Sequence, residues 1–202
     1  LEALGAFFDA MPAGTGMSFV VIQHLSPDYK SLMAELLAKH TEMEVKRAEE
    51  GMSVEADKVY IIPPRKNLRM FHGKLLLSEQ ERNERGINLP IDVFFSSLAE
   101  DQGEKAVGII LSGTGSDGAR GLRSIKEAGG MVLAQEPDTA RFDGMPRAAI
   151  DTNLVDSVLP VADMPARLLA LASHPYVAKP ASSSPLLMEE DPMESMNIFP
   201  DS

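Results

Sequence analysis

The sequence predicts an α/β fold in which a doubly wound, mostly parallel sheet carries helices on both faces. Four short apolar runs, rich in β-branched residues, are typical of strands buried on both faces; they lie at residues 19–23, 59–62, 106–111 and 131–134. Helical patterns alternate with these runs, at residues 1–11, 31–40, 91–100, 119–128 and 165–172. Such alternation implies parallel strands joined by crossover helices, a Rossmann-like arrangement of three layers.

The first half of the chain carries clear local signals for its elements. In residues 1–11 apolar side chains recur every three or four positions, and Pro12 ends the pattern. After the first strand, residues 31–40 show the apolar stripe of an amphipathic helix. The next strand stops at Pro63, and two short runs around a central turn predict a β-hairpin within residues 68–77.

The second half continues the alternation of strands and helices. The helix at 119–128 is followed by Gly129, a residue typical of the position after a helix C-terminus. Pro146 favours the first turn of a short helix that reaches Ile150. A short extended segment is expected within residues 154–159, before the last helix.

The composition limits the classes of function. The chain has 202 residues, a net charge of −11 and no cysteine. The lack of cysteine excludes disulfides, zinc–thiolate sites and a cysteine nucleophile, and the acidic charge argues against nucleic acid and anionic membranes as partners. No apolar run approaches the roughly 18 residues of a membrane span, and the pattern of residues predicts no secretory signal. We therefore expect a cytoplasmic protein without membrane insertion.

The composition also predicts two regions. Residues 1–172 contain all the predicted strands and helices and form one domain. Residues 173–202 are rich in proline and serine, and from Pro185 onward every charged residue is acidic. Such a segment is expected to be a linker or tail that is disordered in isolation.

One loop carries most of the functional information. After the strand at 106–111, Gly113, Gly115 and Gly118 fit the pattern G-x-G-x-x-G, which is typical of a phosphate-binding turn between a strand and a helix. Asp117 lies inside the loop, however, where it would put a negative charge beside a bound pyrophosphate. The loop is therefore either a dinucleotide-binding turn or a turn that presents a carboxylate.

A histidine follows another predicted strand. His24 comes directly after residues 19–23, and functional groups in open α/β sheets gather beyond the carboxyl ends of the strands. His24 and Asp117 together suggest a histidine oriented by a carboxylate, two members of a nucleophilic triad. Each alone also has a structural interpretation, as a hydrogen-bonded histidine and as an aspartate capping the helix that follows it. No histidine pair has metal-ligand spacing, and the sequence predicts no metal and no cofactor.

With these motifs the chain resembles the catalytic domain of the CheB-type chemotaxis protein-glutamate methylesterases. The matching segments run in order through residues 1–172; they include Gln-His-Leu-Ser-Pro at 23–27, Leu-Ser-Gly-Thr-Gly-Ser-Asp-Gly-Ala at 111–119 and Gly-Met-Pro-Arg at 144–147. Residues 91–101 and 112–117 are most similar to the form that is fused to a CheR-type methyltransferase and PAS-containing sensor regions.

The resemblance implies hydrolysis of glutamate γ-methyl esters on a methylated chemoreceptor or signalling protein, with glutamine deamidation in some relatives. It implies a Ser-His-Asp triad in which His24 is the base and Asp117 the carboxylate that orients it. It also implies an oxyanion donor at the backbone N–H of Thr114, and fused methyltransferase or sensor domains in the parent polypeptide.

The resemblance implies a nucleophile that this sequence lacks. The family serine lies in a tight turn after a first strand, immediately before the helix that begins here at Leu1. Ser26, Ser112 and Ser116 lie near the expected site, but serines beside glycine turns are more often capping or turn residues. The first strand, which is also missing, should be central in the sheet, so we expect its two neighbours to leave unpaired edges and an apolar seam.

Three functions are consistent with these observations. The chain is part of a serine methylesterase and is inactive alone, or it is a non-catalytic sensory or partner-binding module of the same fold. The third is a dinucleotide-binding domain that uses the glycine loop.

Overall fold

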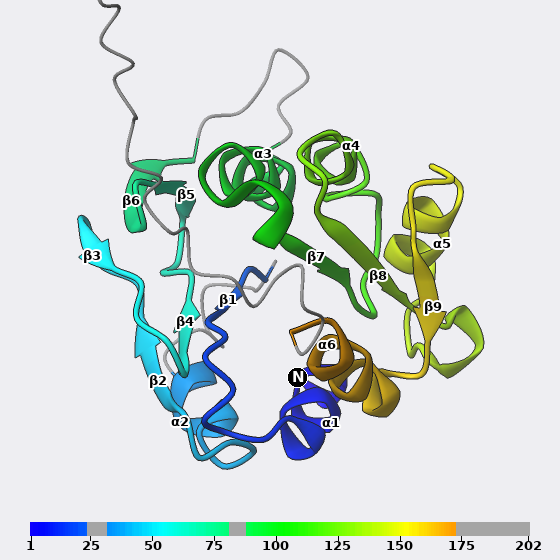
Figure 1. The fold of residues 1–202 in the computed structure, drawn as a ribbon, viewed down its shortest axis with the longest axis horizontal. Helices are drawn as coiled ribbons and strands as arrows, with labels where there is room; N and C mark the ends of the chain where they lie inside the picture. The colour runs from blue at the N-terminus through cyan, green and yellow to red at the C-terminus, as the bar shows by residue number, and fades with distance from the viewer. Residues whose placement is uncertain (24–31, 81–87, 173–202) are drawn as a thin grey trace, which may run out of the picture.

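The computed structural model describes residues 1–23, 32–80 and 88–172, which form a layered α/β structure (Figure 1). Two parallel sheets of three strands each make the middle layer. One has the order β1 (Phe19–Val21), β4 (Lys58–Ile61), β2 (Glu44–Arg47), and the other β7 (Val107–Ile110), β8 (Met131–Gln135), β9 (Ser157–Leu159). The α/β class with parallel strands is thereby confirmed. The predicted linker at 173–202 lies outside the described residues.

A third sheet is antiparallel and lies beside helix α3 (Figure 1). Its order is β3 (Met52–Ser53), β6 (Lys74–Glu79), β5 (Lys66–Phe71). His72 and Gly73 form the two-residue turn of the β5–β6 hairpin, and both have positive φ, as the tight turns of such hairpins require. The hairpin expected within 68–77 is confirmed and is longer at both ends.

Helices lie on both sides of the parallel sheets (Figure 1). Above them in that view are α3 (Pro90–Gln102) and α4 (Gly121–Glu127); below them are α1 (Glu2–Ala10), α2 (Met33–Leu37) and α6 (Met164–Ala172). Helix α5 (Gly144–Ile150) packs beside β8, and short 3-10 turns occur at η2 (Gly103–Lys105), η3 (Pro137–Thr139) and η4 (Val161–Asp163). Within the described ranges none of the helices combines the length and apolarity needed to cross a membrane.

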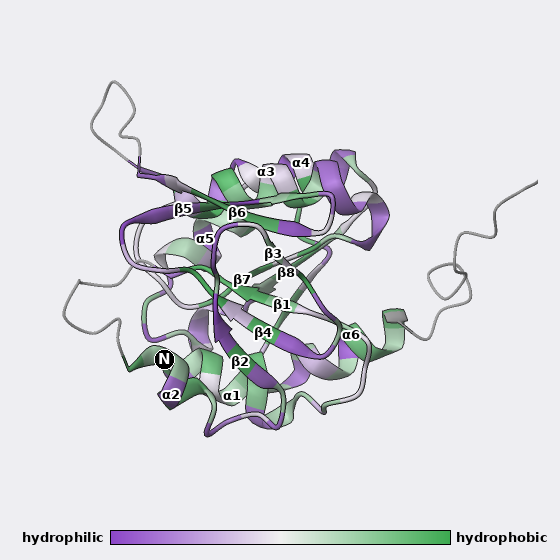
Figure 2. Ribbon diagram, turned by 90° about the vertical axis from the view of Figure 1, so that its left-hand side faces the viewer, coloured by the Kyte–Doolittle hydropathy of each residue, from purple (hydrophilic) through white to green (hydrophobic). Residues whose placement is uncertain are grey.

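Side-chain alternation along the strands divides the core into two apolar clusters. Val132 and Ala134 of β8 join the cluster that contains Phe94 of α3, whereas Leu133 between them joins the cluster that contains Phe7 of α1. This is the two-residue period of a strand buried on both faces. In Figure 2 the hydrophobic colour accordingly includes strand β7, between the helix layers, while the outer strand β2 is largely polar.

Strand β2 was not predicted, because its composition is that of a solvent-facing edge. Glu44, Lys46 and Arg47 interrupt any apolar run, yet all four residues pair with β4. Charge complementarity replaces apolar burial here: Glu44 lies opposite Lys58, with Nζ 3.1 Å from Oε2. Hydrogen bonding to the Lys58 ammonium lowers the pKa of the Glu44 carboxyl. Strand β3, only two residues long, was also missed.

Some predicted bounds were wrong. Helix α2 spans Met33–Leu37, and Ala38 to His40 form a turn after it. Helix α5 begins at Gly144, two residues before Pro146, which still lies in the first turn that proline tolerates. Of the segment 154–159 only Ser157–Leu159 is a strand. Asp156, just before it, accepts the Val132 N–H with its side-chain carboxylate, so this N–H of β8 bonds to a side chain and not to a backbone carbonyl of β9.

Helices α3 and α4 approach closely because Gly121 has no side chain. A Cβ at this position would lie 2.7 Å from Phe95 Cβ and 3.1 Å from Asp92 Cα. Contacts this short require the helices to move apart.

We expect Gly121→Ala to lower the free energy of unfolding by about 1–3 kcal/mol, the usual cost of overpacking a close-packed interface. Urea unfolding followed by circular dichroism measures it. Arg123→Ala is the control on the exposed side of the same helix and should stay within about 0.5 kcal/mol of the unchanged protein. Equal stability of the two variants would show that Gly121 does not set the spacing of α3 and α4.

Candidate functional site

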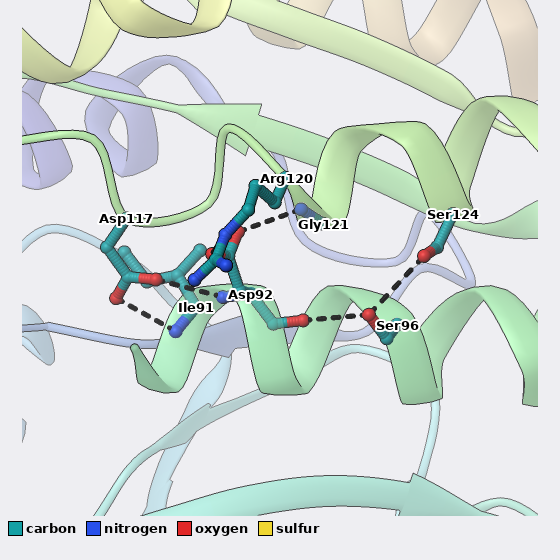
Figure 3. A network of polar contacts seen from close by, with 7 residues as sticks. All are labelled: Ile91, Asp92, Ser96, Asp117, Arg120, Gly121 and Ser124. Carbon is teal, nitrogen blue, oxygen red and sulfur yellow. Dashed lines mark hydrogen bonds and ion pairs between the residues drawn. The ribbon is translucent and has the colours of Figure 1, made fainter. Parts of the chain in front are cut away.

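Asp117 lies in the glycine loop after β7 and is 5% exposed. Its carboxylate faces the first turn of helix α3 (Figure 3). Oδ2 accepts the N–H of Ile91 at 3.1 Å, and Oδ1 accepts the N–H of Asp92 at 3.0 Å. The residue before the helix, Leu89, offers no side-chain cap of its own. Asp117 therefore caps α3 from 26 residues away and satisfies two N–H groups that lack partners within the helix.

Asp92 makes the reciprocal contact to helix α4. Its Oδ1 accepts the N–H of Gly121 at 2.8 Å, and Arg120 Nε lies 3.2 Å from its Oδ2 (Figure 3). One turn further along, Ser96 and Ser124 join the two helices through their hydroxyls, 3.3 Å apart. Each helix thus has its first turn capped by a carboxylate from the partner side, which fixes the loop that contains Asp117.

This arrangement corrects one interpretation of Asp117 and weakens another. The expected cap of the following helix was wrong, because the residue preceding α4 is Arg120 and Asp117 caps α3 instead. The dinucleotide interpretation needs the N-terminus of α4 for a phosphate. That position receives the Asp92 carboxylate, which would repel an anionic ligand.

Gly118 must be glycine for two reasons. Its φ of +94° lies in a region that other residues rarely adopt, and a Cβ there would lie 2.8 Å from both Ile110 Cδ1 and Ile91 Cγ2. The glycine after Asp117 lets the loop turn while the carboxylate stays against α3.

Thr114, the expected oxyanion donor, lies in the exposed part of this loop. Ser112, two residues before it, is held from β8 by Gln135, which is 3% exposed and was not identified from the sequence. Gln135 Oε1 accepts the Ser112 N–H at 2.8 Å, and its Nε2 donates to the Thr139 carbonyl at 3.1 Å. A buried polar residue at the end of an apolar strand was the signal that could have identified it.

The Gly-Met-Pro segment, whose role the sequence left open, holds the same loop from a second side. Gly113 N–H donates to the Phe142 carbonyl at 2.9 Å, and Met145 N–H donates to the Gly113 carbonyl at 2.9 Å. A Cβ at Gly113 would lie 2.3 Å from Met145 Sδ, so any side chain there requires the Met145 side chain to move. The backbone around Thr114 is therefore positioned by two neighbouring segments.

A cavity of about 860 Å³ separates the two parallel sheets. Strands β1 and β7 are end strands of their sheets, and both line it. Helix α3 contributes Phe94 and Phe95, and helix α1 contributes Phe7 and Phe8. The expected apolar seam between two unpaired strand edges is thus present in the described structure.

The carboxyl ends of both strands open into this cavity. Gln23, Ser112, Gly113 and Thr114 all line it. Gln23 Oε1 is buried and has no hydrogen-bond partner among the described residues. An unsatisfied buried acceptor costs about 1–3 kcal/mol, so this oxygen is suited to receive a donor from a segment that occupies the cavity.

His24 and Ser26 lie outside the described residues. The two other serines considered from the sequence are described. Ser112 Oγ accepts the Phe142 N–H at 3.0 Å, which gives it a structural role. Ser116 is exposed in the loop beside Asp117.

Comparisons with known proteins agree with the motifs. A 104.1 kDa uncharacterized protein of Rhodobacter capsulatus is 49% identical over 127 residues, which are 63% of this chain and 13% of that protein. A protein-glutamate methylesterase/protein-glutamine glutaminase of Anaeromyxobacter dehalogenans is 35% identical, over 84% of this chain and 50% of its own length. The chain thus spans half or less of these two relatives.

The structural comparison covers the same region. The crystal structure of the Thermotoga maritima CheB methylesterase catalytic domain superposes with a TM-score of 0.74 at 30% identity, covering 84% of this chain and 92% of that one. The family model for CheB methylesterase matches residues 1–168. The chain therefore belongs to the CheB methylesterase family.

Proposed function

We propose that this chain carries the base and the orienting acid of a serine protein-glutamate methylesterase. The observation that carries the proposal is the common cavity at the carboxyl ends of β1 and β7. Thr114, three residues before Asp117, lines it from one side, and Gln23, immediately before His24, lines it from the other. The substrate is a protein glutamate γ-methyl ester, as the names of the curated relatives state for those proteins.

The proposal includes a strand that fills the cavity. A segment ahead of Leu1 in the same polypeptide would pair with β1 and β7 at once, join the two sheets and place a serine beside His24. Helices α1 and α3 border the cavity on its two sides with apolar side chains, which suits a strand buried on both faces. Gln23 Oε1 would accept a donor from this segment.

The reaction follows from these assignments. The serine oxygen attacks the ester carbonyl carbon while His24 accepts its proton, and the N–H of Thr114 stabilises the resulting oxyanion. Collapse of this intermediate breaks the C–O bond, and His24 returns the proton to the departing methanol. Water then attacks the acyl-enzyme with the same base, releasing glutamate and restoring the serine. Deamidation of glutamine would differ only in its leaving group, ammonia.

Asp117 can cap α3 and orient a histidine at the same time. An ionised carboxylate offers about four acceptor sites, and the Ile91 and Asp92 N–H groups require two bonds. Its attachment to α3 would keep the carboxylate in one position while the imidazole gains and loses a proton.

In the full-length protein we expect His24→Ala and Asp117→Asn each to lower kcat for a glutamate methyl-ester substrate by about 10³–10⁴-fold. The amide of Asp117→Asn cannot stabilise an imidazolium. Methanol release measures the rate. Full activity of a folded Asp117→Asn variant would show that the triad assignment is wrong.

The double role of Asp117 requires a matched control. Asp92→Asn disturbs the same capping exchange without touching the proposed triad, so it should lower stability and keep most of the activity. Asp117→Ala should lose about 1 kcal/mol of unfolding free energy with the cap. If Asp92→Asn inactivated the enzyme as strongly as Asp117→Asn, the carboxylates would act through loop structure alone.

The proposed strand has its own test. In the natural polypeptide, the cavity-facing amides of β1 and β7 should exchange slowly with deuterium, and a fluorophosphonate should label a serine ahead of Leu1. In residues 1–202 alone the same amides should exchange faster and no serine should be labelled. A natural polypeptide without a serine-bearing strand ahead of Leu1, or with labelling at Ser112 or Ser116, would contradict the proposal.

A further inference from the structure

Arg141 and Phe142 form an exposed lip on the cavity, and neither belongs to the catalytic assignments above. Both line the cavity together with Ser112, Gly113 and Thr114. Phe142 is 52% exposed, an unusual state for a large aromatic ring. The Arg141 guanidinium carbon lies 5.6 Å from the centre of that ring, within the range of a cation–π contact.

The lip is fixed to the loop that holds the proposed oxyanion donor. Phe142 N–H donates to Ser112 Oγ at 3.0 Å, and its carbonyl accepts the Gly113 N–H at 2.9 Å. The backbone of the lip is therefore attached directly to the two residues before Thr114. Side chains held in this way can contact the parts of a substrate that flank the reacting group.

Arg141 differs from Arg147, the next cation along the chain, and from Lys126 on helix α4. Arg147 is paired with Asp143, and hydrogen bonding to this guanidinium lowers the pKa of the Asp143 carboxyl. Lys126 is paired with Asp156. Arg141, by contrast, forms no ion pair with a carboxylate of the described residues, and among the described residues that line the cavity it is the one cationic side chain.

This position matters because the whole chain carries a net charge of −11. An acidic protein segment would be repelled by the molecule at long range, and an unpaired guanidinium at the cavity would supply the local attraction that lets it bind. Ester hydrolysis turns a neutral side chain into a carboxylate. A segment with several glutamates therefore presents esters next to carboxylates whenever it is partly demethylated.

We propose that the Arg141–Phe142 lip is a specificity determinant that selects methyl-esterified glutamates in acidic protein segments. Arg141 pairs with an unesterified carboxylate near the reacting ester, and Phe142 packs against the apolar part of the segment. The assignment of a hydrolysed ester rests on the function proposed above, whereas the preference for an acidic segment is a binding property.

The test compares two peptides that differ only in charge around one glutamate methyl ester. One has glutamates and aspartates as flanking residues, and the other has glutamines and asparagines. With the full-length protein we expect a higher kcat/KM for the acidic peptide. In Arg141→Ala this preference should fall by up to about fivefold, the upper end of what an exposed ion pair supports. In Arg141→Lys most of it should remain.

Two further measurements separate charge recognition from a structural effect. The part of the preference that Arg141→Ala removes should decrease as salt rises, because a contact of this kind is screened. Arg123→Ala removes an exposed arginine on α4 that does not line the cavity, and it should keep the preference. An unchanged preference in Arg141→Ala, or an equal loss in Arg123→Ala, would overturn the proposal.

Fluorescence anisotropy measures the affinity of the protein for each labelled peptide, and it tests the role of the lip even if neither peptide is hydrolysed. A preference for the acidic peptide that Arg141→Ala removes supports the lip in a protein that fails as an esterase. Equal affinity of the unchanged protein for both peptides would overturn the proposed role of the lip, even if the esterase is active.

Discussion

The exchange of carboxylates between helices α3 and α4 is the interaction on which the site depends. Asp117 precedes α4 and caps α3, while Asp92 in the first turn of α3 caps α4. The two caps are separate sets of hydrogen bonds, and together they join the first turns of α3 and α4. The loop between β7 and α4 is thereby held against α3. The backbone of Ser112 and Gly113, just before Thr114, is held in turn by Gln135 and by the segment at Met145. In the proposed function, Asp117 would serve both helix stability and catalysis.

The second constraint is the separation of the two parallel sheets. Each ends toward the cavity in a strand, β1 or β7, that has one paired neighbour among the described residues. The side chains around this gap are those of a protein interior, with phenylalanines from both helix layers. The cavity-facing edges of β1 and β7 carry backbone groups without strand partners, and one strand between them would supply hydrogen bonds and apolar contacts. The candidate site lies at the same cavity because parallel sheets place their functional groups at the carboxyl ends of their strands.

Much of the fold could be predicted from the sequence, because strands buried on both faces and amphipathic helices leave periodic apolar patterns. The runs at β1, β4, β7 and β8 were identified for this reason. Strand β2 was missed because Glu44 and its neighbours are stabilised by pairing and by Lys58 rather than by burial. The position of Asp117 in a functional loop was visible in the sequence, but its partner helix was not, since a cap supplied from 26 residues away leaves no local pattern. The role of Gln135 was hidden for the same reason, because its contacts connect segments distant along the chain. The assignments of His24, Asp117 and Thr114 to catalysis remain predictions.

The gap between β1 and β7 also has a consequence for synthesis on the ribosome. In the proposed arrangement the strand that fills it is made first, but one of its two partners, β7, ends at Ile110. At roughly 5–20 residues per second, the emerging apolar strand therefore waits on the order of 5–20 s for that partner. During this interval a hydrophobic segment destined for the centre of the molecule is exposed to the cell. In the proposed arrangement, the order of translation thus leaves a strand buried on both faces without one of its two partners for this interval.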